Sequence, residues 1–153
     1  MADAVAVAEF QTAAWNSAYR ELVQPEYLAR MSVTTRIERW GSRIRQGNRS
    51  IFLAEDDDRL DGVVSFGESG DELELMSLYI ADEIRSTGLG SRLLEFALGD
   101  RAAILWVFRD NARAIAFYRR HGFELDGGES VDDDTGLALV RMRRLEVRPV
   151  RDR

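Results

Sequence analysis

Apolar residues recur at helical spacing through the first third of the chain. Over residues 2–23 they fall near one stripe, at intervals of three or four residues, which predicts a helix. Residues 26–31 and 34–46 predict two further helices. Thr34 or Thr35 is expected to cap the last of them. The stripe of the first helix consists of Val7, Phe10, Ala14, Trp15 and Ala18.

From residue 50 onward, short apolar runs alternate with turn residues. Residues 50–69 predict a β-hairpin with an acidic turn at residues 56–58, and residues 71–81 predict a further strand. The order of helices and strands indicates a single α/β (α+β) domain over residues 1–144, in which helices flank a mixed sheet. The remaining predicted elements are a helix ending near Gly99, a strand at 102–108, a helix at 111–122 capped by Asp110 or Asn111, and strands at 123–130 and 135–144.

The strand at residues 71–81 changes its apolar face midway. Leu73 and Leu75 have one parity, whereas Met76, Leu78 and Ile80 have the other. A β-bulge, which inserts one residue, would explain this switch. Burial of the strand on both faces would explain it equally well, so both interpretations stay open.

Composition and charge narrow the classes of function. The 153-residue chain has a formal net charge of −6, which argues against a general nucleic-acid binder. It has no Cys, which excludes disulfides, thiolate metal sites and a Cys nucleophile, and its apolar runs are too short to span a membrane. It also has no Lys, so neither a Schiff base nor a P-loop lysine is available. These features favour a cytoplasmic protein.

The stretch "IRSTGLGSRLL" at residues 84–94 joins a strand to an amphipathic helix. Such turns bind phosphate because backbone N–H groups and the positive end of the helix converge there. A P-loop is excluded by the missing lysine, and a dinucleotide fingerprint fits poorly because Leu93 occupies the place of its third glycine. The pattern that remains is Arg-x-x-Gly-x-Gly, formed by Arg85, Gly88 and Gly90. The alternative is an ordinary turn in which the glycines only shape the backbone.

Two stretches in the expected order resemble the motifs of one protein family. "LYIADEIRSTGLGSRLL" at residues 78–94 resembles the coenzyme-A-binding motif of the GNAT superfamily of N-acetyltransferases. "LWVFRDNARAIAFYRRHGFE" at residues 105–124 resembles the second motif of that family. Asp82 departs from the pattern, in which a proline is usual. The resemblance implies a mostly antiparallel, twisted sheet with a bulged central strand.

The resemblance also implies an activity. The family transfers an acetyl group from acetyl-CoA to a primary amine of a small molecule or peptide, by direct attack in a ternary complex and without a metal. A non-catalytic acyl-CoA-binding or interaction module of the same fold is the alternative function. The residues implied to hold coenzyme A are Leu78, Tyr79, Ile80, Arg85, Ser86, Thr87, Gly88, Leu89, Gly90, Ser91 and Asn111.

Two residues are implied to carry the chemistry. Tyr118 occupies the place of the family's general acid, where a phenol can donate a proton to the departing thiolate. Glu74 occupies the place where some members keep a general base, with Glu72 or a water as alternatives. Tyr118 packing on a helix face and Glu74 exposed on a strand are the structural alternatives for these two residues.

The acceptor amine is less readable from the chain. Several acidic residues fall in segments that often line the acceptor groove of the family, and an acidic groove would favour a cationic amine. These residues are Glu21, Glu26, Glu129 and residues 132–134.

The N-terminus departs from the family, whose members usually open with a strand. The first strand is missing here, while "LEVRPV" at residues 145–150 is similar to it. Residues 147–150 of the tail (145–153) are therefore predicted to supply that strand. A three-residue bridge spans about 10 Å, whereas the place of the first strand is about 20–25 Å away. This favours donation to a neighbouring chain in a strand-swapped homodimer; a disordered tail is the alternative.

Overall fold

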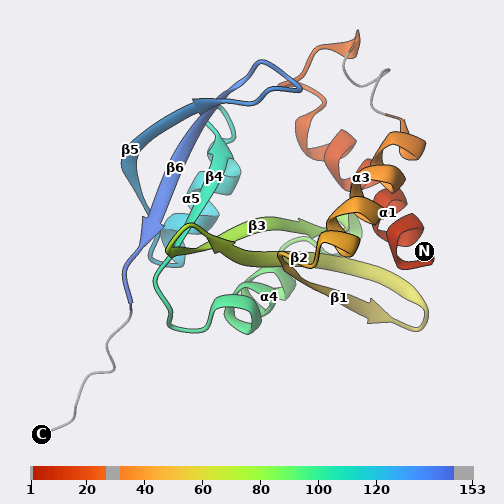
Figure 1. Ribbon diagram of the computed structural model, residues 1–153, viewed down its shortest axis with the longest axis horizontal. Coiled ribbons are helices and arrows are strands. Elements are labelled where there is room, and N and C mark those ends of the chain that lie inside the picture. The colour runs from red at the N-terminus through yellow and green to blue at the C-terminus, as the bar shows by residue number, and fades with distance from the viewer. Residues whose placement is uncertain (1, 27–31, 147–153) are drawn as a thin grey trace, which may run out of the picture.

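The computed structural model describes residues 2–26 and 32–146 (Figure 1). The described strands form one sheet in the order β1-β2-β3-β4-β6-β5, in which only β3 and β4 run parallel. This confirms the predicted mixed, mostly antiparallel sheet flanked by helices. The helices are α1 (Ala2–Tyr19), α3 (Val33–Gln46), the 3-10 helix η1 (Asp82–Ile84), α4 (Leu89–Leu98) and α5 (Ala112–Arg120), and the strands are β1 (Ser50–Asp56), β2 (Arg59–Ser69), β3 (Glu72–Ile80), β4 (Ala103–Phe108), β5 (Glu124–Val131) and β6 (Ala138–Arg144).

Two helix boundaries differ from the prediction. The first helix ends at Tyr19 instead of continuing to Val23, because the N–H groups of Leu22 and Val23 both donate to the Tyr19 carbonyl and close a turn. The N-cap of α3 is Ser32, whose hydroxyl accepts the N–H of Thr35 at 3.1 Å. The helix predicted over residues 26–31 lies, apart from Glu26, outside the described residues.

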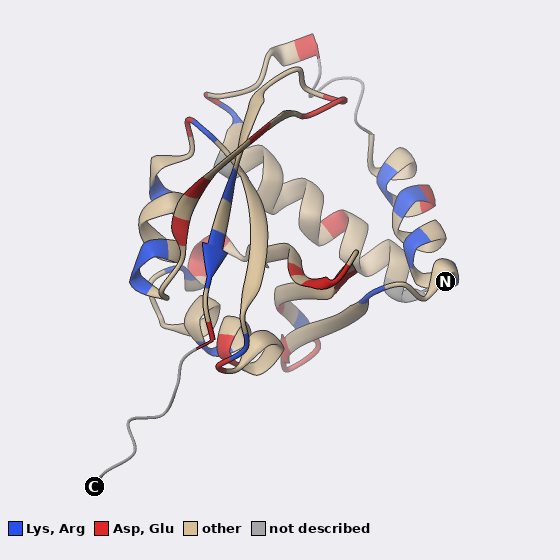
Figure 2. Ribbon diagram, turned by 60° about the vertical axis from the view of Figure 1, so that its left-hand side comes forward, with Lys and Arg blue, Asp and Glu red and all other residues tan. Residues whose placement is uncertain are grey.

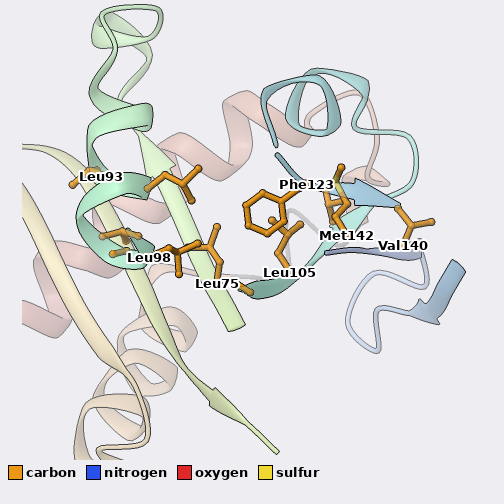
Figure 3. Close-up of a cluster of buried hydrophobic side chains, with 12 residues drawn as sticks. Leu75, Leu93, Leu98, Leu105, Phe123, Val140 and Met142 are labelled. Atoms are coloured by element: carbon orange, nitrogen blue, oxygen red, sulfur yellow. The ribbon is translucent and has the colours of Figure 1, made fainter. Parts of the chain in front are cut away.

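Helices cover both faces of the sheet. On one face, Ala4, Val7 and Ala8 of α1 pack with Trp40 of α3 against Val63 of β2. On the other face, α4 contributes to a second apolar cluster that extends over β3, β4 and β6 (Figure 3). The central strands are therefore enclosed between α1 and α3 on one side and α4 on the other.

The bulge predicted in β3 is confirmed. Ser65 pairs with Ser77 and the next residue, Phe66, pairs with Leu75, so Met76 is the inserted residue. As a result, the apolar residues on either side of the bulge (Leu73, Leu75, Leu78 and Ile80) all pack against the α4-side cluster. The bulge thus resolves the switch of parity without burying the strand equally on both faces.

The parallel pairing of β3 with β4 is short. It joins Glu74 to Ile104 and Leu75 to Leu105, and it ends next to the bulge at Met76. Beyond this point the two strands separate, and β4 continues its pairing with β6 alone.

The described sheet has β5 at one edge and β1 at the other, and β1 pairs only with β2. The strand predicted at residues 147–150 lies outside the described residues.

Within residues 2–26 and 32–146, no helix combines the length and the apolar character needed to cross a bilayer.

Candidate functional site

A cleft of about 1020 Å³ opens where β3 and β4 separate. Its lining comes from both strands, from α1 and α3 on one face of the sheet, and from the turn before α4 on the other. Helix α5 and the loop between β5 and β6 complete the wall. Because the cleft passes between the two strands, it connects the two faces of the sheet.

The turn before α4 has the geometry of an anion site. Gly88 has φ +89° and stands at the N-cap of the helix, and Ser86 is also left-handed with φ +66°. The N–H of Arg92 bonds to the Gly88 carbonyl, whereas the N–H groups of residues 89–91 have no acceptor within the helix. A Cβ at Gly88 would meet nothing within 4 Å, so the backbone conformation, and not crowding, favours glycine here.

Side chains hold this turn in place. The Arg85 guanidinium lies 2.9 Å from the Asp82 carboxylate, so the residue that replaces the usual proline pairs with the arginine of the motif. The Thr87 hydroxyl donates to the Ile84 carbonyl at 2.6 Å. At the first turn of α4, the Ser91 hydroxyl and His121 Nε2 are 3.0 Å apart. Burial, followed by Arg120 and Arg144, lowers the pKa of His121, which favours a neutral imidazole in this contact.

The structure brings most of the predicted coenzyme A residues together. Thr87 and Leu89 are the two that do not line the cleft: Thr87 is exposed, and Leu89 packs against the apolar cluster. The predicted residues that do line it are Leu78, Tyr79, Ile80, Arg85, Ser86, Gly88, Gly90, Ser91 and Asn111.

Asn111 has two contacts at the start of α5. Of the two predicted caps, it is Asn111 and not Asp110 that occupies the N-cap, and its Oδ1 accepts the N–H of Ala114 at 3.2 Å. Its Nδ2 lies 3.5 Å from the hydroxyl of Tyr19. The cap therefore positions the amide so that its nitrogen faces the cleft wall formed by α1.

Three tyrosines converge on the cleft. Tyr118 is half-buried there, and burial, followed by the proximity of Tyr79, raises the pKa of its phenol well above the usual value. Burial raises the pKa of Tyr19 in the same direction, with Tyr79 and Tyr118 adding to the effect. Tyr79 accepts a hydrogen bond from Gln11 Nε2 at 3.2 Å. The phenols of Tyr118 and Tyr19 therefore remain protonated beyond the pH at which a free tyrosine ionises.

Tyr19 and Gln11 were not singled out from the sequence, although a signal was present. Val7, Gln11, Trp15 and Tyr19 follow one another at intervals of four residues, so they share one face of α1. Gln11 is a polar residue within that otherwise apolar face. In the structure it also accepts the indole N–H of Trp40 at 2.6 Å, so it links α1 with both α3 and β3.

The two glutamates considered as bases lie apart from the tyrosines. Glu72 forms an ion pair with Arg143 of β6, which lowers its pKa through the hydrogen bond. Glu74 is half-buried and does not line the cleft. It stands five positions before Tyr79 on the strand, which corresponds to at most about 16 Å. Its charge acts instead on Arg49, the pKa of which is lowered by burial.

The acceptor side of the cleft differs from the acidic groove that the sequence predicted. Asp132 and Asp134 line the cleft, but the other predicted acidic residues do not, namely Asp133, Glu21, Glu26 and Glu129. Facing the two aspartates are three arginines of α3, a helix along which Figure 2 shows several basic positions. They are Arg36, Arg39 and Arg43.

Comparisons with known proteins agree with this geometry. A family model described as acetyltransferase (GNAT) domain matches residues 47–125, just over half of the chain. The probable N-acetyltransferase Rv2775 of Mycobacterium tuberculosis is 28% identical over 130 residues, which cover 79% of this chain and 74% of that protein. The chain therefore belongs to the GNAT family and is an N-acetyltransferase, which confirms the resemblance of its two motifs.

Solved structures show the same fold. The PaiA N-acetyltransferase of Thermoplasma acidophilum, in complex with coenzyme A, is 18% identical with a TM-score of 0.68, covering 95% of this chain and 94% of that one. The structure of YncA from Salmonella typhimurium, with its cofactor acetyl-CoA, is 21% identical with a TM-score of 0.64, covering 99% and 93%.

The raised phenol pKa values can be tested by titrating the ultraviolet absorbance of tyrosinate. The chain has four tyrosines. The Tyr118→Phe and Tyr19→Phe variants are each expected to keep the full absorbance step of the parent near pH 10, because the deleted phenol does not ionise there. In denaturant all tyrosines titrate, so the absorbance step of each variant should be one quarter smaller than that of the parent. This difference calibrates the absorbance of a single tyrosine. A smaller step in the folded variant would contradict the shift.

Proposed function

We propose that the protein transfers the acetyl group of acetyl-CoA to a primary amine of a small molecule or peptide, by direct attack in a ternary complex. The observation that carries this proposal is the cleft between β3 and β4, which places the α4 turn, Asn111 and Tyr118 around one space open to both faces of the sheet. A donor and an acceptor can therefore enter from opposite faces and meet between the strands.

The residues on the α4 side fit the phosphates and the arm of coenzyme A. The N–H groups of residues 89–91 point out of the helix start and are suited to a pyrophosphate. Arg85 adds positive charge, and open space at Gly88 leaves room for a ligand against the backbone. Beyond the bulge, β3 no longer pairs with β4, so its main-chain groups from Leu78 to Ile80 can bind an extended pantetheine arm.

Tyr118 would act on the departing sulfur. As the C–N bond forms and the C–S bond breaks, the phenol donates its proton to the sulfur, and water then returns a proton to the phenol. The raised pKa of Tyr118 keeps it a donor over the pH range in which amines lose their protons and makes its reprotonation favourable. Activity should therefore rise with pH as the acceptor amine deprotonates, and loss of the phenol proton should reduce it only well above the pH of about 10 at which a free tyrosine ionises.

The geometry favours water, and not a glutamate, as the group that accepts the proton of the amine. Glu74 lies at most about 16 Å along β3 from Tyr79 and outside the cleft lining. Glu72 is engaged with Arg143. Water in the open cleft can receive the proton without either carboxylate, so we assign Glu74 no direct contact with the amine.

Replacing Tyr118 with Phe tests the acid. The variant is expected to lose about 100-fold in kcat while its dissociation constant for acetyl-CoA changes little, because only the proton donor is removed. Turnover is read as free thiol released from acetyl-CoA, and affinity by calorimetry. Equal turnover in the variant and the parent would remove Tyr118 from the mechanism.

Replacing Glu74 with Gln separates the two possible proton acceptors. If water accepts the proton, kcat/KM should stay within about threefold of the parent, a change far smaller than the loss of a general base causes. A loss of about 100-fold at every pH would instead restore Glu74 as the base.

The anion site can be tested with a pair of glycine substitutions. Gly88→Glu is expected to weaken acetyl-CoA binding at least about 100-fold, because it adds backbone strain and places a carboxylate in the turn. Gly99→Glu is the matched control, since Gly99 also has positive φ and open space around it but stands at the other end of α4, away from the cleft. Similar calorimetric affinities in both variants would contradict the assignment of the turn.

A further inference from the structure

Three arginines on one face of α3 line the acceptor side of the cleft. Arg36, Arg39 and Arg43 are spaced by three and four residues, so they form a row along the helix, here called the α3 arginine row. Arg45, on the same helix, is exposed and does not line the cleft. The row therefore faces the cleft, while the helix carries further basic charge outside it.

Tryptophan rings support two members of the row. The Arg43 guanidinium lies 4.9 Å from the centre of the Trp40 ring, and that of Arg36 lies 5.3 Å from the centre of the Trp15 ring. Trp40 is fully buried, and its N–H donates to Gln11. Arg36 is itself only 4% exposed. Arginines held this way lose little freedom when their planar N–H edges bind a ligand.

The carboxylates opposite the row are already engaged. Asp134 binds Arg39 through two hydrogen bonds of 2.7 and 3.1 Å, and this contact lowers the pKa of Asp134. Asp132 accepts hydrogen bonds from the N–H and the hydroxyl of Thr135 at 2.9 and 2.6 Å. Among the described residues, no carboxylate forms a salt bridge with Arg43.

Arg43 lines the same cleft as Tyr79 and Tyr118. Burial lowers the pKa of its guanidinium and Arg39 adds to this effect, while Tyr79 and Asp134 oppose it. The row stands on the α1 and α3 face of the sheet, opposite the α4 turn. An acceptor entering from this face passes the row on its way to the thioester.

From these contacts we infer that the α3 arginine row binds an oxyanion of the acceptor. The acceptor is then an amine that also carries a carboxylate or a phosphate, as an amino acid does, and not a polycation. Arg43 is the residue that determines this specificity, because an arginine edge binds a carboxylate or phosphate through two parallel hydrogen bonds. A polyamine would bring further positive charge against the row. This inference rests on the proposed acetyl transfer.

Binding of product-like compounds tests the inference without turnover. Trp15 and Trp106 line the cleft and Trp40 lies under Arg43, so intrinsic fluorescence should report a ligand there. Protein saturated with coenzyme A is titrated with N-acetylglycine, N-acetylleucine and N-acetylaspartate, with the matching carboxamides, with N-acetylphosphoethanolamine, and with N1-acetylspermidine. At least one of the carboxylates should bind about tenfold or more tightly than its carboxamide and than N1-acetylspermidine, or the phosphate should bind about tenfold or more tightly than the carboxamides and N1-acetylspermidine. Comparison of the carboxylates with the phosphate identifies which oxyanion is preferred.

Variants of α3 assign the effect to a residue. Arg43→Gln should lose about tenfold or more in affinity for the preferred oxyanion. The affinity of Arg43→Lys should lie between those of Arg43→Gln and the parent, because a lysine keeps the charge but not the planar edge. Arg45→Gln is the matched control and should bind like the parent. Thermal unfolding of the variants shows whether α3 remains packed.

Several results would overturn the inference. These are equal or tighter binding of the carboxamides or of N1-acetylspermidine, no binding of any acetylated compound, or unchanged oxyanion affinity in Arg43→Gln. Turnover of the free amines tests the proposed function separately. Acetylation of spermidine in preference to the amino acids would keep the acetyl transfer and overturn the inference. Failure to acetylate any amine would overturn the transfer, while the titration still decides whether the row binds an oxyanion.

Discussion

The bulge at Met76 is the constraint on which the site depends. An inserted residue bends its strand and disrupts the local ladder, and here it follows directly after Leu75, the last residue of β3 that pairs with β4. Because the pairing stops at this point, the middle of the sheet opens between two strands that would otherwise continue side by side. The same insertion restores the alternation of side chains, so that Leu78 and Ile80 stay in the α4-side core while Tyr79 is directed to the α1 face. One residue therefore creates the cleft without sacrificing the core around it.

The features on the α4 side of the cleft could be predicted from the sequence because they depend on local geometry. A left-handed glycine at a helix start, an Asn cap and a change of strand parity each involve residues that are neighbours in the chain. Their spacing therefore indicated the turn, limited the cap to Asp110 or Asn111, and made a bulge one of two interpretations, of which the family resemblance implied the bulge. The boundaries that were wrong, at Tyr19 and Ser32, follow from turn and cap hydrogen bonds for which the apolar periodicity carries no signal.

The acceptor side could not be predicted in this way, because it is formed by segments far apart in the chain. Arg39 and Asp134 are separated by 95 positions, and only the folded sheet brings α3 against the loop between β5 and β6. On the sequence, the arginines of α3 are indistinguishable from the polar face of any surface helix, and the aspartates suggested an acidic groove. The structure pairs Asp134 with an arginine and Asp132 with its own loop, so the acidic residues no longer define the charge of the wall.

The two sides of the cleft also differ in the kind of group that forms them. The α4 turn offers mostly backbone N–H groups, which the fold itself supplies, so the proposed binding of the donor depends on the backbone more than on particular side chains. The opposite wall consists of side chains from α1, α3 and one loop, which belong to neither of the two strands that separate. A single fold can therefore keep one donor while the acceptor changes with a few residues, and in this chain the residues at that place are arginines held on tryptophan rings. A guanidinium stacked on an indole cannot move away from an approaching ligand without losing that contact. The position of this charge is therefore fixed in the wall, and this is the physical basis of the proposed discrimination between acceptors of opposite charge.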